Sequence, residues 1–117
     1  LCTGAGAGAA SRFRQADLVV ALTHSPENLA AILTTEAADG GQWADLILTG
    51  HTHGGQMRVF ERTLFSLTDR ERESLSGWKK YGSAFLLTSQ GIGCEAINLR
   101  LNSQAEAHLI TLRCKEG

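Results

Sequence analysis

Two apolar runs of strand length, residues 17–23 and 45–49, are separated by a segment with helical spacing. Both runs are continuous rather than alternating, which is typical of strands that are covered on both faces. Between them, Ser25 predicts a helix N-cap with Pro26 at the first helical position, and apolar residues recur at helical spacing up to the glycine pair 40–41. The sequence therefore predicts a strand–helix–strand unit with parallel strands joined by a right-handed crossover.

The remainder of the chain is richer in strand patterns. A polar segment at residues 62–80 contains an alternating-charge run at residues 69–73, which is typical of a solvated helix face or loop. On either side of this segment the pattern predicts further strands, at residues 56–60, 84–89, 96–101 and 107–113. The predicted fold class is therefore mixed α/β (α+β), with a β-rich second part.

Composition narrows the class of protein. The chain of 117 residues is 43% hydrophobic, and its 11 Lys and Arg balance 12 Asp and Glu to a formal charge of −1. This charge gives no overall field for holding nucleic acid, so we expect no specific nucleic-acid partner. No apolar run approaches the roughly 20 residues of a membrane-spanning helix. We expect one domain, with residues 1–15 as a loop or frayed end.

The cysteines indicate a reducing compartment. Cys2, Cys94 and Cys114 are odd in number, far apart in sequence and without a CxxC spacing. This pattern is typical neither of a disulfide framework nor of a cysteine zinc site. We therefore expect a cytoplasmic location.

Three of the four histidines follow predicted strands: His24 after the first apolar run, and His51 and His53 after the second. Because open α/β sheets place their ligand sites at the carboxyl ends of strands, His24 and His51 are expected to converge at one edge. In extended chain, His51 and His53 would lie about 6.5–7 Å apart on one side, a spacing suited to two neighbouring metal ions. The alternative is a set of hydrogen-bonded structural histidines in a glycine-rich turn.

These residues carry a resemblance to a known family. Residues 50–56, Gly-His-Thr-His-Gly-Gly-Gln, resemble the extended GHxH motif of the calcineurin-like metallophosphoesterases, in the bacterial membrane-associated branch. Residues 22–26, Leu-Thr-His-Ser-Pro, resemble the upstream strand of that branch that ends in a single histidine. Residues 89–93 and the apolar patterns after them are similar to its closing strands. The resemblance covers residues 16–113.

The resemblance implies a fold and a reaction. It implies the C-terminal half of a four-layered α/β/β/α sandwich and hydrolysis of phosphomonoesters or phosphodiesters at a dinuclear centre. His24 and His51 would bind one divalent ion of the Mn, Fe or Zn class, and His53 would bind the other. The family's remaining ligands come from D-x-H, GD and GNH[DE] motifs, none of which occurs in this sequence. The implied partners are a phosphoester substrate and an N-terminal half, whose leading segment would bring membrane association.

The charges of such a site are unbalanced in this chain. Asp17 and Asp45 open their strands and are expected at the far end from the histidines, and Glu27 is expected to point away. Without a bridging carboxylate we expect partial, single-ion occupancy and little or no hydrolysis by this chain alone. The alternative function is a non-catalytic metal-binding or partner-binding remnant of the fold. An uncovered sheet face would also favour self-association.

Two further residues follow the histidine motif closely. Gln56 and Arg58 are candidates for substrate binding, because a guanidinium at this position could hold a phosphate oxygen. A role at the surface, away from the pocket, is the alternative.

Overall fold

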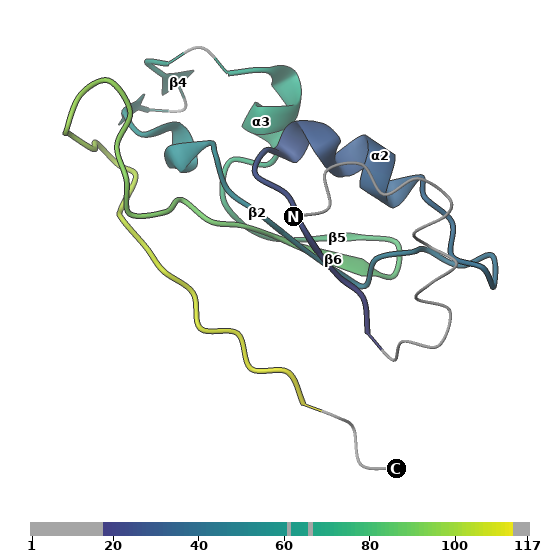
Figure 1. Ribbon diagram of the computed structural model, residues 1–117. Helices are drawn as coiled ribbons and strands as arrows, with labels where there is room; N and C mark the ends of the chain where they lie inside the picture. The colour runs from purple at the N-terminus through teal and green to yellow at the C-terminus, as the bar shows by residue number, and fades with distance from the viewer. Residues whose placement is uncertain (1–17, 61, 66, 114–117) are drawn as a thin grey trace.

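A four-stranded mixed sheet forms the centre of the protein (Figure 1). The computed structural model describes residues 18–60, 62–65 and 67–113, so the predictions for residues 1–15, Asp17, Cys2 and Cys114 lie outside the described residues. The strand order is β1-β2-β6-β5. Strands β1 (Val20–Leu22), β2 (Leu46–Thr49) and β6 (Ala84–Thr88) run parallel, and β5 (Gly77–Tyr81) pairs antiparallel with β6. The mixed α/β class predicted from the sequence is confirmed.

The predicted strand–helix–strand unit is present. Ser25 accepts a hydrogen bond from the backbone N–H of Glu27 and caps the 3₁₀ helix η2 (Pro26–Asn28), which continues into α2 (Leu29–Leu33). The helix is shorter than its sequence pattern predicts. The hydroxyls of Thr34 and Thr35 donate back to carbonyls one turn earlier, and regular helix ends at Leu33.

The hydrophobic core lies between α2 and one face of the sheet. Ile47 of β2 and Leu86 of β6, which are Cα partners, are both completely buried. The other buried members come from β1, α2, the segment before β2 and the start of β6, and they are Ala21, Leu29, Trp43, Ala44 and Ala84. This packing fixes the positions of the β1 and β2 carboxyl ends, where the histidines lie.

Strand β5 lies within the segment that the sequence predicts to be polar. Its Lys79 and Lys80 obscure an alternating pattern in which Trp78 faces one side of the sheet and Tyr81 packs against the core. A two-residue turn connects Tyr81 to Ala84, and the side chain of Gln42 accepts from the Ser83 backbone N–H. The prediction of a strand at residues 84–89 is confirmed by β6.

Two small elements complete the region between the histidine loop and β5. The strand predicted at residues 56–60 is reduced to β3 (Arg58–Val59), which pairs with β4 (Arg62–Thr63). The charged run forms the helix α3 (Asp69–Glu73), which begins with a capping box at Thr68. Figure 1 shows α3 on the same side of the sheet as α2.

The prediction of two strands near the C-terminus is wrong. Residues 96–98 form bends, residues 99–100 have no regular structure, and Leu101 makes a single bridge with Met57. Residues 107–113 have no strand partner among the described residues. The segment runs away from the sheet in Figure 1. Alternating apolar residues favour extended chain, but a strand needs hydrogen-bonding partners, and the described residues provide none there.

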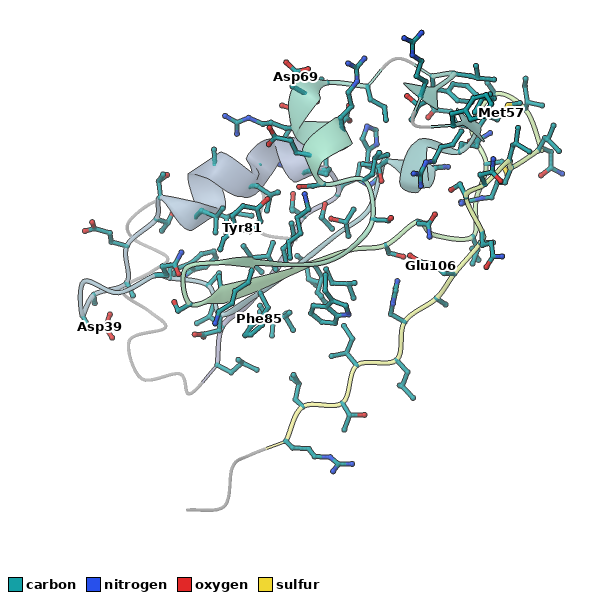
Figure 2. All side chains as sticks on the ribbon, turned by 180° about the vertical axis from the view of Figure 1, so that it is seen from behind. Asp39, Met57, Asp69, Tyr81, Phe85 and Glu106 are labelled. Atoms are coloured by element: carbon teal, nitrogen blue, oxygen red, sulfur yellow. The ribbon has the colours of Figure 1, made fainter. Side chains whose placement is uncertain are left out.

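The second face of the sheet is apolar and partly exposed, with Leu46 and Leu87 buried within it. Val20 and Leu22 of β1, Trp78 of β5 and Phe85 of β6 lie on this face and are each at least 39% exposed. Figure 2 shows Phe85 on the opposite side of the sheet from Tyr81. Among the described residues, no helix is long and apolar enough to cross a membrane.

Candidate metal site

The first strand-end histidine meets the first histidine of the glycine-rich loop. The Gly50 backbone N–H donates to the carbonyl of His24 at 3.1 Å, and the Thr49 hydroxyl donates to the same oxygen. The two imidazoles make an edge contact, with ring centroids 4.7 Å apart, and His51 Nδ1 lies 2.9 Å from His24 Nε2. The expected convergence of the two strand ends is therefore present.

The loop after β2 is tightly coiled rather than extended. His51, His53 and Gln56 have φ values of 70°, 50° and 39°, in a region that non-glycine residues rarely occupy. Gly54 has a φ of 60°, and a Cβ there would lie 2.2 Å from the Gln90 side-chain oxygen. The extended-chain spacing expected for His51 and His53 is wrong, because the loop turns into the 3₁₀ helix η3 (His53–Gly55).

A carboxylate that the sequence analysis missed contacts His51. Glu71 of α3 places Oε1 3.2 Å from His51 Nε2, and its side chain is only 8% exposed. The sequence contains the signal for the helix start, since Thr68 and Glu71 have capping-box spacing. It contains no signal for the contact, which joins elements that are adjacent only in the folded chain.

Hydrogen bonds to the main chain fix the position of His53. Its carbonyl oxygen accepts hydrogen bonds from the Arg100 guanidinium and the Ser103 hydroxyl, at 3.3 and 2.5 Å. Its Nδ1 atom is buried and has no hydrogen-bond partner among the residues that the structure describes. A buried nitrogen of this kind is unfavourable unless a ligand satisfies it.

A pocket of about 220 Å³ lies beside the loop, and we call it the histidine pocket. It is lined by His51, Thr52, His53, Gly55, Gln56, Phe65, Leu67, Glu71, Glu95 and Ala96. His24 lies outside this lining and joins the site through its contact with His51. The lining therefore includes both histidines of the loop and two acidic residues, Glu71 and Glu95.

The two candidate substrate-binding residues lie in different surroundings. Gln56 is 2% exposed, and its amide bonds only backbone groups: the carbonyls of residues 95, 97 and 99 and the N–H of Glu95. Arg58 lines a separate pocket with Val59, Phe60, Leu101 and Asn102. Binding of substrate by either residue stays a prediction.

The described residues bring two histidines together but do not provide a full set of metal ligands. Within residues 18–60, 62–65 and 67–113, no three side chains of His, Cys, Asp or Glu gather in an arrangement that could hold a metal ion. Glu71 does not complete such a set, because it contacts the edge of the His51 ring opposite to Nδ1. The pair of nitrogens 2.9 Å apart still fits one ion, since two nitrogens about 2.0–2.1 Å from an ion can be separated by this distance.

Known proteins show sequence similarity to this chain. The chain is 33% identical over 92 residues to the "Phosphodiesterase YaeI" of Escherichia coli (strain K12), covering 78% of this chain and 31% of that protein. It is 30% identical over 100 residues to an "Uncharacterized metallophosphoesterase" of Aquifex aeolicus (strain VF5), covering 83% and 33%. It is also 32% identical over 98 residues to the "Uncharacterized protein YpbG" of Bacillus subtilis (strain 168), covering 84% and 32%.

These similarities suggest a distant relationship to the metallophosphoesterase superfamily, whose name implies the use of metal ions. The chain spans about a third of the length of the curated relatives that it matches. No protein-family model and no solved structure matches it.

Proposed function

We propose that this chain is the C-terminal part of a divalent-metal-dependent phosphoesterase that hydrolyses phosphomonoesters or phosphodiesters. The observation that carries the proposal is the pair of His24 Nε2 and His51 Nδ1, 2.9 Å apart at the ends of two parallel strands. His24 and His51 would hold one ion and His53 a second. Bound divalent ions would polarise the phosphoryl group and compensate the charge that develops on its oxygens.

The rest of the ligand set would come from outside this chain. Three imidazoles are neutral ligands, and a dinuclear centre needs carboxylates to compensate its charge. The partly exposed face of the sheet supports this division, because exposed apolar side chains such as Val20, Leu22, Trp78 and Phe85 are typical of a surface that another polypeptide covers. We propose that the covering part also supplies these ligands, as half of a two-sheet sandwich; association of two copies is the competing occupant of this face.

Metal titration of this chain tests the site directly. We expect Mn²⁺ to bind with fewer than two equivalents after dialysis, and we expect His24→Ala or His51→Ala to abolish binding. The control is His108→Ala, which removes a histidine that contacts Glu106 in the C-terminal segment. Equal loss of binding in the control, or tight retention of two ions by the chain, would contradict the proposal.

Turnover tests the reaction. When an N-terminal portion with the missing ligand motifs is supplied, we expect Mn²⁺-dependent hydrolysis of bis(4-nitrophenyl) phosphate, and we expect His51→Ala to abolish it. A second function is favoured by the incomplete donor set of the described residues: a single-ion or partner-binding module without catalysis. Metal binding without turnover in the completed protein would favour this second function.

A further inference from the structure

The two oxygens of Glu71 have different partners. Oε2 accepts the backbone N–H of Thr68 at 2.8 Å and completes the capping box, while Oε1 lies 3.2 Å from His51 Nε2. Thr68 also donates its hydroxyl to Glu27 of η2. The Thr52 hydroxyl donates to the Leu75 carbonyl beyond α3 at 2.7 Å. These bonds attach α3 to both sides of the histidine site, so the carboxylate has a fixed position.

This arrangement favours one position for the proton of the His51 imidazole. An ionised carboxylate only accepts hydrogen bonds, and a neutral imidazole has one N–H and one bare nitrogen. The negative charge of Glu71, 3.2 Å from His51 Nε2, therefore favours the tautomer with the proton on Nε2. The bare lone pair is then on Nδ1, the atom that lies 2.9 Å from His24 Nε2.

We infer that Glu71 is a positioning residue that holds His51 in its Nε2–H tautomer and thereby makes Nδ1 the metal-binding atom. The tautomer itself depends only on the observed contacts. Its consequence for metal binding rests on the proposed function. A carboxylate behind a ligating histidine orients the ring and raises the basicity of the opposite nitrogen.

The substitution Glu71→Gln gives a directional test. Gln serves in capping boxes as Glu does, so its amide oxygen is expected to keep the Thr68 N–H. Its NH₂ group then faces His51 Nε2, and because this group only donates, it requires a bare Nε2. The substitution should therefore move the proton to Nδ1 while the helix cap is retained. Glu73→Gln, at an exposed position of the same helix, removes the same charge away from the histidine and is the matched control.

Nitrogen-15 NMR of the imidazole rings, at one pH at which they are neutral, reads the tautomer without any metal. We expect Nε2–H for His51 in the wild type and in Glu73→Gln, and Nδ1–H in Glu71→Gln. Titration with Zn²⁺ alone should then give an affinity about tenfold or more lower for Glu71→Gln than for Glu73→Gln.

The outcomes separate this inference from the proposed function. Nδ1–H in the wild type overturns the inference, and this measurement does not depend on any variant folding. An unchanged tautomer in folded Glu71→Gln overturns it as well. If the tautomer switches as expected but Zn²⁺ binds neither protein, the positioning role stands and the metal function fails. Thr68→Ala, which removes the cap hydroxyl and keeps the carboxylate, should lower stability and leave the tautomer unchanged.

Discussion

The guanidinium of Arg100 donates a hydrogen bond to the main-chain carbonyl of His53, 47 positions earlier in the chain. The same side chain donates to the carbonyls of Gln90 and Gly93, at 2.8 and 2.5 Å. Arg100 thus connects the histidine loop to the turn after β6. Its partners are backbone oxygens and the Ser103 hydroxyl, so the contacts depend on the shape and charge of the guanidinium.

Replacement of Arg100 by Met should therefore destabilise the fold. The carbonyls of Gln90, Gly93 and His53 would each lose a charged donor, and we expect a loss of about 2–3 kcal/mol in the free energy of unfolding, measured in urea. The control is Arg72→Met, because Arg72 is 60% exposed and lies 4.0 Å from Asp69. This surface change should stay within about 0.5 kcal/mol. Equal losses for the two variants would contradict the role of Arg100.

Gly54 is required for two reasons, and a paired substitution separates them. Gly54→Ala would place a Cβ 2.2 Å from Gln90 Oε1 and 2.6 Å from Ser103 Oγ, in addition to the strain of a φ of 60°. Gly40 has a φ of 82° but open space around it, so Gly40→Ala adds strain alone. We expect losses of about 1 kcal/mol for Gly40→Ala and about 2–4 kcal/mol for Gly54→Ala in thermal or urea unfolding. A smaller loss at Gly54 than at Gly40 would contradict the close packing of this loop.

Gln56 should contribute to stability through its bonds to the backbone of residues 95–99. In Gln56→Leu, the backbone groups that bond to the Gln56 amide would lose their partners. This loss should cost about 2–4 kcal/mol in the free energy of unfolding. Amide hydrogen exchange at residues 95–99 should also accelerate. Unchanged exchange and stability, with weaker substrate binding in the completed protein, would instead favour the substrate-binding role.

The stability of the C-terminal segment should depend on pH through the ionisation of the Glu106 carboxyl. Burial acts to raise the pKa of this carboxyl, but hydrogen bonds from the Gln90 backbone and side chain and the contact with His108 hold its pKa below the ordinary value. A depressed pKa in the folded state means that the carboxylate stabilises the fold above the unfolded pKa of about 4.3, and that this contribution is lost as pH falls through the folded value.

Glu106→Gln should therefore be less stable than the wild type near neutral pH, and the difference should shrink as pH falls from about 5 through the lowered pKa. Urea unfolding at a series of pH values measures this difference. A difference that is constant across the series would show that the charge of Glu106 has no part in the effect.

The sequence pattern correctly predicts the part of the fold in which the local conformational preferences of the residues agree with their places in the folded chain. Continuous apolar runs and the Ser25–Pro26 cap predicted β1, α2 and β2, and the rule for strand ends predicted the meeting of His24 with His51. It fails where the outcome depends on whether a pairing partner is present. Strand β5 exists because β6 pairs with it, while residues 107–113 have no such partner within the part of the chain that the structure describes.

The same limit applies to the site. The histidine spacing predicts extended chain, but the positive φ values of His51 and His53 belong to a coiled loop that is held by Arg100 and Ser103. Glu71 reaches His51 only because α3 packs beside η2. Long-range contacts of this kind leave no periodic trace in one sequence.

The strand order gives the two paired histidines unequal freedom. His51 follows β2, which has a hydrogen-bonded neighbour on each side, whereas His24 follows the three-residue strand β1, which is paired on one side only among the residues that the structure describes. A border strand frays at a smaller energetic cost than an interior one. Under the proposed function, an ion would meet one firmly anchored imidazole, that of His51, and one on a less firmly held strand, that of His24, which would move first to fit the radius of the ion.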